Sequence, residues 1–105
     1  MDYGVAIWLY LRMFKMLFEL GRVIATPDAL GALQENNTNM SELLIRHVGG
    51  DWGNLSDEDR LENEQSVKNG WRILSSYPLN NTGDKIWIIT EADRSSTCLL
   101  LPKEY

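Results

Sequence analysis

The feature that most constrains this fold is a short segment near the C-terminal end that is apolar on both faces. The sequence KIWIITE, residues 85–91, combines three isoleucines with a tryptophan, and these residue types favour β-strands. Side chains alternate between the two faces of a strand, so Ile86 and Ile88 share one face while Trp87 takes the other. A strand that is apolar on both faces is typical of the interior of a sheet that is covered on each side. The segment therefore predicts a central strand.

Two further segments complete the expected sheet. WRILSSY, residues 71–77, and TCLLL, residues 97–101, are short apolar runs that favour strands. PLNNTGD, residues 78–84, joins the first of them to the central strand with asparagine, threonine and glycine, which are turn residues. Strands joined by such short connections pair antiparallel. We therefore expect a three-stranded antiparallel meander that ends at Pro102.

Two segments carry the start and stop signals of helices. TPDALGALQENN, residues 26–37, opens with a threonine that can cap a helix and a proline suited to its first turn. SDEDRLENEQSVKNG, residues 56–70, opens with a serine, places acidic residues in its first turn and ends at a glycine. Only Leu61 and Val67 are apolar inside this second segment, so we expect its helix to lie on the surface.

Two shorter segments are predicted as strands. GRVIAT, residues 21–26, follows a glycine break, whereas ELLIRHV, residues 42–48, fits a helix or a strand, and the glycine pair after it favours a strand. With 105 residues, 44% of them hydrophobic, the chain has the size and composition of a single domain over residues 1–105. These elements predict an α+β fold in which helices pack on a small antiparallel sheet.

The first 20 residues, MDYGVAIWLYLRMFKMLFEL, are the most apolar part of the chain. In a helix, Arg12, Lys15 and Glu19 would form one narrow polar stripe, and the rest of the circumference would be apolar. A helix as apolar as this is a poor solvent-facing element. We therefore expect residues 1–20 to pack on the core or on a second copy, and the second case predicts a homodimer.

No transmembrane segment is expected at this end. The uninterrupted apolar run, residues 3–11, is much shorter than the roughly 20 residues that span a bilayer. A signal peptide begins with basic residues, whereas an acidic residue follows Met1. Two alternatives stay open. The segment binds a membrane surface, or translation starts at Met13 or Met16 and residues 1–15 are an extension outside the domain.

The balance of charge narrows the class of partner. Fifteen acidic and ten basic residues give the chain a net charge of −5. A domain with this charge repels the phosphates of DNA and RNA, so direct nucleic-acid binding is not expected. Five acidic residues gather in the predicted surface helix: Asp57, Glu58, Asp59, Glu62 and Glu64. Such a cluster is usually a solvated face, and it is also the best candidate for contact with a protein partner.

The single cysteine, Cys98, excludes an intramolecular disulfide and any cysteine-rich zinc site. A lone free thiol fits a cytoplasmic location. Because Cys98 falls in a predicted buried strand, we expect it in the core. We also expect Trp52, Trp71 and Trp87 in the core, since basic residues are not interleaved with them as they are in a base-stacking surface.

The segment HVGGDWG, residues 47–53, has two interpretations. In the first, His47 is a general base and Asp51 is its orienting partner or a metal ligand. In the second, the glycines make a turn and Trp52 anchors that turn in the core. We favour the structural interpretation, because one histidine does not supply a usual catalytic zinc site. No metal and no cofactor are therefore expected.

The segment TEADRSST, residues 90–97, is a second candidate. Glu91 and Asp93 could act as a pair of carboxylates, and Arg94 could bind an anionic group. The structural interpretation is a hairpin loop in which Asp93 bonds the turn backbone and Arg94 pairs with a carboxylate. The predicted path of the chain places His47 and Glu91 at opposite ends of the sheet, so we do not expect the two candidates to form one site.

Several motifs resemble a family of small bacterial proteins that also occur on plasmids and in prophage regions. Members are often labelled "type I restriction endonuclease subunit M" or "plasmid-related protein". The resemblance covers about residues 16–105 and rests on four stretches: LGRVIATPDAL, RHVGGDWG, RILSSY and IWIITEADRSSTCLLLPKEY. The restriction label implies adenine methylation. The chain contradicts that activity, because it has no Asn-Pro-Pro-Phe/Tyr catalytic motif and no glycine-rich cofactor loop.

Two classes of function therefore stay open. We expect a non-enzymatic, acidic protein-binding module of bacterial or mobile-element origin that acts on a host defence or DNA-processing complex. The alternative is a small enzyme or ligand-binding domain that uses His47 and Asp51, or Glu91, Asp93 and Arg94. Convergence of these side chains on one concave pocket would favour the alternative.

Overall fold

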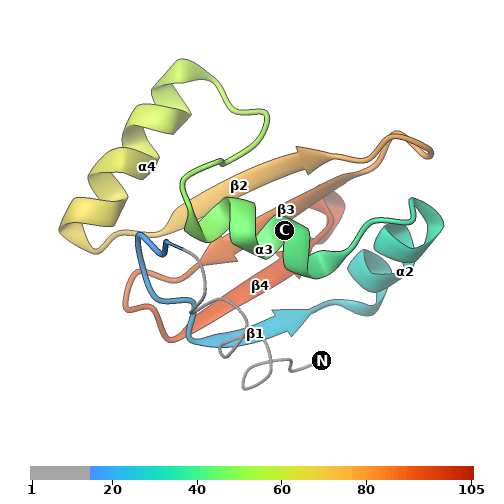
Figure 1. Ribbon diagram of the computed structural model, residues 1–105, viewed down its shortest axis with the longest axis horizontal. Helices are drawn as coiled ribbons and strands as arrows, with labels where there is room; N and C mark the ends of the chain where they lie inside the picture. The colour runs from blue at the N-terminus through green and yellow to red at the C-terminus, as the bar shows by residue number, and fades with distance from the viewer. Residues whose placement is uncertain (1–14) are drawn as a thin grey trace.

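The computed structural model describes residues 15–105, which fold around a four-stranded sheet (Figure 1). In chain order the elements are β1 (Arg22–Ala25), α2 (Pro27–Glu35), α3 (Met40–Val48), α4 (Asp57–Asn69), β2 (Ile73–Pro78), β3 (Lys85–Thr90), β4 (Ser96–Leu100) and the 3₁₀ turn η1 (Pro102–Glu104). The strands lie in the order β1-β4-β3-β2. The class is α+β, with helices on a sheet, as the sequence predicts.

The sheet itself corrects the expectation of a purely antiparallel, three-stranded meander. Strands β2, β3 and β4 pair antiparallel in sequence order, but β1 pairs parallel to β4 and makes the sheet mixed. Val23 and Ala25 of β1 are buried, and Ile24 lies opposite Cys98. A parallel pair needs a long connection, and here the chain between β1 and β4 contains the three helices α2, α3 and α4 and strands β2 and β3. Nothing in the short segment GRVIAT indicates which distant strand it will join.

The segment ELLIRHV forms helix α3 and not a strand, so that prediction is wrong. Asn39 caps the helix, because its side chain accepts a hydrogen bond from the backbone N–H of Ser41 at 2.8 Å. The buried residues of α3 are Leu43, Leu44, His47 and Val48. They recur three and four positions apart, which places them on one helix face. The glycine pair therefore ends a helix.

Helices α2 and α4 begin where the sequence predicts. The Thr26 hydroxyl accepts a hydrogen bond from the N–H of Ala29 at 3.0 Å, and Ser56 accepts one from the N–H of Asp59 at 3.1 Å. Helix α4 ends at Gly70, which has a left-handed conformation. Within residues 15–105, no helix is long and apolar enough to cross a membrane.

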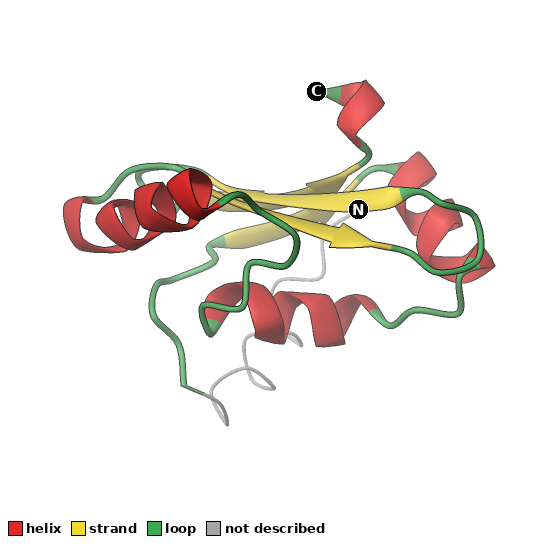
Figure 2. Cartoon of the chain, turned by 90° about the horizontal axis from the view of Figure 1, so that it is seen from above, coloured by secondary structure: helices red, strands yellow, loops and turns green. Residues whose placement is uncertain are grey.

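The sheet has one thickly covered face and one thinly covered face. Figure 2 shows α3 packed below the sheet, the C-terminal turn above it, and α2 and α4 beside its two ends. The side chains between α3 and the sheet form the core, which includes Val23, Leu43, Leu44, Val48, Ile73, Ile86, Ile88 and Leu99. Strand β3 lies between β2 and β4, as predicted for KIWIITE.

Three expected core residues are not fully buried, and the thin cover of the second face explains two of them. Trp87 is half-buried on this face, where its ring contacts that of Tyr105 at 5.7 Å. Cys98 is also half-buried. Trp71, which lies before β2, is 52% exposed. Trp52 alone of the three tryptophans lies in the core, at 5% exposure.

The predicted N-terminal helix falls mostly outside the described residues. Residues 1–14 are not described, so the proposed packing, the homodimer and the start site stay predictions. Residues 15–20 contain no helix, which corrects that part of the prediction. Here the chain runs beside α3, where the N–H of Leu17 donates to the carbonyl of Val48 at 2.9 Å. Phe18 and Leu20 are buried in the core.

Candidate functional site

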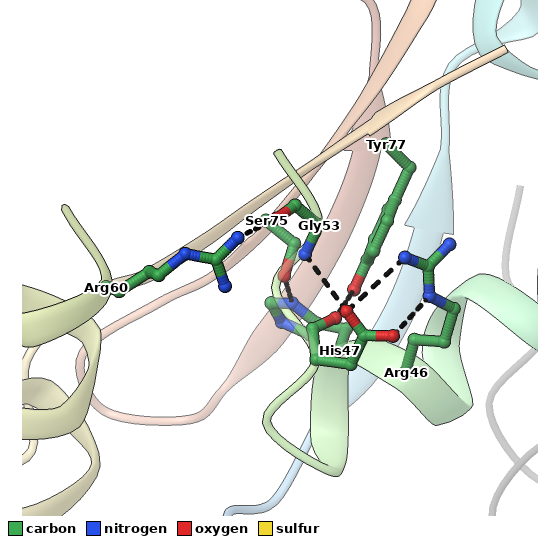
Figure 3. A network of polar contacts seen from close by, with 7 residues as sticks. Arg46, His47, Gly53, Arg60, Ser75 and Tyr77 are labelled. Atoms are coloured by element: carbon green, nitrogen blue, oxygen red, sulfur yellow. Dashed lines mark hydrogen bonds and ion pairs between the residues drawn. The ribbon is translucent and has the colours of Figure 1, made fainter. Parts of the chain in front are cut away.

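His47, the candidate general base, is fully buried between α3 and the sheet. Its Nδ1 lies 2.6 Å from the Ser75 hydroxyl of β2, and its Nε2 lies 2.9 Å from the Thr90 hydroxyl of β3 (Figure 3 shows the first contact). Both ring nitrogens are therefore engaged with the protein. Access to a substrate would require α3 to leave the sheet.

The hydrogen bonds fix the tautomer of His47. The Thr97 hydroxyl donates to the carbonyl of Leu20 at 2.7 Å, so its single proton is used there. Thr90 must then donate to Thr97 across their 2.7 Å contact, and its oxygen must accept from His47 Nε2. The proton on His47 therefore sits on Nε2, and Nδ1 accepts from Ser75. The chain of bonds links α3 to three strands.

Burial keeps the His47 ring neutral. Removal of the imidazole from water, together with the smaller effect of the nearby positive charge of Arg94, lowers its pKa to about 3. The ring also meets that of Phe18 edge to face, with 5.1 Å between centroids. A group with so low a pKa remains unprotonated near neutral pH and is a poor proton acceptor there.

Asp51 is paired with Arg46 and not with His47. Its Oδ2 accepts from Arg46 Nε at 2.7 Å, and this hydrogen bond lowers the pKa of the carboxyl. Its other oxygen accepts from the N–H of Gly53 at 3.3 Å. The hydroxyl of Tyr77 donates to the Asp51 carbonyl at 2.7 Å. Asp51 thus fixes the loop after α3, and the His47–Asp51 hydrogen bond that a catalytic loop requires is not formed.

The side chains of the second candidate site, Glu91, Asp93 and Arg94, contact three separate sets of partners. Glu91 accepts from Arg72 at 3.2 Å, and Asp93 accepts from the N–H of Ser95 at 3.0 Å. These two carboxylates therefore serve separate contacts. Arg94 binds no carboxylate of residues 15–105, contrary to the structural interpretation of the sequence. It donates to the backbone carbonyls of Ser66, Trp71 and Glu91 at 2.8, 2.6 and 3.1 Å.

Arg94 therefore ties the end of α4 to the loop between β3 and β4. The Ser66 carbonyl also accepts from the backbone N–H groups of Gly70 and Trp71 at 3.0 and 3.1 Å, so the guanidinium adds a charged donor at this end of the helix. The path predicted from sequence is wrong at this point. His47 and Glu91 are not at opposite ends of the sheet, because Thr90, the neighbour of Glu91, hydrogen-bonds to His47. Even so, the side chains of His47, Asp51 and Glu91 do not converge.

Arg94→Ala is expected to lower the free energy of unfolding by about 2–3 kcal/mol, because three carbonyls lose a charged donor. Asp93→Ala is the matched change in the same loop. It should have a much smaller effect, because water can replace the exposed carboxylate. Urea denaturation of the two variants measures both values. Equal losses would contradict the helix-anchoring role of Arg94.

The predicted partner-binding acids all lie on α4, and all are exposed: Asp57, Glu58, Asp59, Glu62 and Glu64. The helix buries only Asn63 and Ser66. Asn63 donates to the Leu74 carbonyl at 2.7 Å and accepts from the Leu74 N–H at 3.2 Å. Arg60 donates to the carbonyl of Gly53 at 2.6 Å. Polar contacts thus hold α4 beside β2, and its outer surface faces solvent.

Sequence reasoning missed the residues that surround His47. Ser75, Thr90 and Thr97 occupy buried positions of three strands, where apolar residues are usual. Their signal in the sequence is a polar residue at an inward position of an otherwise apolar strand. Arg72, which binds Glu91, was missed because its partner lies 19 residues away.

Within residues 15–105, no three histidine, cysteine, aspartate or glutamate side chains form a group that could hold a metal ion. The arrangement around His47 is a structural network, and the charged surface of α4 is the feature best placed to meet another molecule.

Comparisons of the chain with protein-family models, with curated proteins and with solved structures found no match.

Proposed function

We propose that the chain is an acidic protein-binding module with α4 as its contact element, and that it is not an enzyme. The observation that supports this most is the attachment of α4. Asn63 and Arg60 hold one side of the helix to the sheet and to a loop, while its five carboxylates stay exposed. Charge of one sign on a fixed surface attracts a partner of the opposite sign and speeds association. The partner is a protein with a basic surface.

An exposed apolar side chain on α4 supports the same proposal. Leu61 is 61% exposed and is flanked in sequence by Arg60 and Glu62. Interfaces commonly combine an apolar centre with a polar rim. Leu61 would supply the centre, and the carboxylates would supply the rim.

The resemblance to proteins of bacteria and mobile elements makes the proposed partner more specific. In this more specific proposal the partner belongs to a host defence or DNA-processing complex, and its basic surface is one that otherwise binds DNA. The acidic helix would then occupy that surface and compete with DNA phosphates. The chain itself would bind no nucleic acid.

The alternative, a small enzyme or ligand-binding domain, has less support. His47 is closed off by Ser75 and Thr90, and Asp51 is neutralised by Arg46. Arg94 is occupied by backbone carbonyls. Each of these three groups thus already has a structural partner.

The experiment is site-specific photocrosslinking in the organism that encodes the chain. A photoreactive amino acid replaces Leu61 on α4 or, as the control position, the exposed Gln34 on α2. We expect position 61 to give one dominant protein adduct that position 34 does not give. Removal of three α4 carboxylates by the triple change E58Q/E62Q/E64Q should abolish it.

The matched control removes the same number of charges elsewhere. The triple change E19Q/E35Q/E42Q neutralises three exposed carboxylates outside α4 and should leave the adduct intact. Loss of the adduct in both triple variants, or in neither, would contradict a specific role for α4. A further measurement asks whether the chain and DNA compete for the captured partner. Competition is expected if α4 occupies a DNA-binding surface.

A further inference from the structure

We propose that the hollow between α4 and β2 receives a lysine or arginine side chain of the partner protein. This inference rests on the proposed function, because it names the contact that the acidic surface makes. It commits to one occupant, a cationic side chain presented by a basic protein. In addition to a general electrostatic attraction to α4, the inference assigns one defined site on the acidic surface.

The hollow has a volume of about 180 Å³. It is lined by Leu55, Asp59, Glu62, Asn63, Arg72 and Leu74. A single water needs roughly 10–15 Å³ of space measured in this way, so the hollow is large enough for a long side chain. Leu55 and Leu74 are half-buried and give it apolar walls.

The polar groups at the base of the hollow already have partners. The Asn63 side chain is 5% exposed, and its amide bonds both the N–H and the carbonyl of Leu74. Arg72 donates to Glu91 and, at 2.6 Å, to the hydroxyl of Tyr105. Its guanidinium is therefore directed to Glu91, just after β3, and to Tyr105 at the C-terminal end.

The two carboxylates of the hollow are available. Asp59 and Glu62 are three positions apart on α4, so they lie on one side of the helix. Both are exposed, and within the described part of the chain neither forms a side-chain hydrogen bond or an ion pair. Two carboxylates and the guanidinium of Arg72 give the lining of the hollow a net charge of −1, which favours a positive charge beside the unpaired Asp59 and Glu62.

A lysine or arginine side chain matches both parts of the hollow. Its methylene stem can cover Leu55 and Leu74, and its charged end can reach Asp59 and Glu62. Hydrogen bonds between a cationic donor and a carboxylate are stronger than neutral ones. The carboxylates of Glu58 and Glu64 do not line this hollow, although they lie on the same helix.

The test uses the full chain and a capped peptide of six arginines as the probe. Its dissociation constant is measured by calorimetry for two double variants that lose equal charge. D59N/E62Q should weaken binding at least about tenfold, because it removes the charged hydrogen bonds of the hollow. E58Q/E64Q should weaken it by about two- to threefold, as for exposed charges that act only at a distance. Circular dichroism confirms that both variants keep the fold.

A second readout locates the probe. In the NMR spectrum, the side-chain amide of Asn63 and the backbone amides of Leu55 and Leu74 should shift on titration of the unaltered chain. They should not shift in D59N/E62Q. Equal weakening by both double variants, with no shift at these amides, would overturn the site and leave the acidic surface as the contact. Unchanged affinity in both variants would overturn the site and the proposed function together.

Discussion

Acidification from pH 7 to pH 5 is expected to reduce the free energy of unfolding by about 2 kcal/mol, because His47 is buried without a charge. Burial lowers the pKa of His47 from 6.5 to about 3 in the folded chain. In the unfolded chain the ring returns to water, and its pKa returns to its ordinary value of about 6.5. The unfolded state therefore binds a proton that the folded state does not bind.

The direction of the effect follows from this difference. Above pH 6.5 the ring is neutral in both states, and His47 adds no pH dependence. Between pH 6.5 and pH 3 only the unfolded state is protonated, so stability falls by about 1.4 kcal/mol for each pH unit. At pH 3 the loss that comes from His47 alone reaches about 4–5 kcal/mol, a large share of the stability of a small domain.

The control is His47→Gln, measured by urea denaturation over the same pH range. The glutamine amide can still accept from Ser75 and donate to Thr90, but it does not titrate. His47 is the only histidine of the chain, and no other side-chain type has an ordinary pKa near 6.5. We expect the variant to be less stable at pH 7 and nearly independent of pH down to pH 5. Parallel curves for the two proteins would show that another group controls the acid response.

The sequence predicts those parts of the fold that depend on local signals. The caps Thr26 and Ser56 start the helices that they were expected to start, and the turn residues 78–84 join β2 to β3. These signals act within a few residues of the backbone groups that they satisfy. These parts of the fold can therefore be predicted without knowledge of the rest of the chain.

Helix α3 begins with a local signal in the sequence that the prediction of a strand did not use. The glycine pair after ELLIRHV can end a helix as well as a strand, so it does not separate the two. The deciding signal is Asn39, which caps the helix, with Glu42 three residues later. That spacing is typical of a helix start.

The surroundings of His47 could not be predicted, for a different reason. Its partners Ser75 and Thr90 lie 28 and 43 residues away. They meet His47 only because α3 packs on the sheet in one register, and the position of β1 next to β4 is likewise a long-range result. A sequence pattern identifies buried faces but not which buried faces touch. The acids of α4 were easier to place, since exposure follows from the polar character of the helix itself.

A glycine in the loop after α3 allows the close approach of two backbones as well as a positive φ. One pair of variants can distinguish these two roles. Gly53 has φ of 76°, and so does Gly83 in the turn between β2 and β3. Alanine in this left-handed region costs about 1–2 kcal/mol at either position. The two glycines differ in what surrounds them. A Cβ at Gly83 would meet no atom within 4 Å, whereas a Cβ at Gly53 would lie 2.1 Å from the Ser76 carbonyl oxygen.

The close approach at Gly53 exists because the loop pairs with the edge of β2. The Asn54 N–H donates to the Ser76 carbonyl at 2.7 Å, and the Ser76 N–H donates to the Trp52 carbonyl at 3.1 Å. A methyl group at position 53 would force these backbones apart and break both bonds, at about 0.5–1.5 kcal/mol each. It would also pull Trp52 from its buried position.

Gly53→Ala is therefore expected to lower the free energy of unfolding by about 3–4 kcal/mol, and Gly83→Ala by about 1 kcal/mol. Urea denaturation at pH 7 gives both values, and an unchanged slope with denaturant confirms that the native state stays compact. The difference between the variants isolates the contact with Ser76, because φ is 76° at both sites. Equal losses would mean that the loop can move away from β2 at little cost. In that case the glycines of this loop would serve the turn alone, and the edge of β2 would be open to another strand.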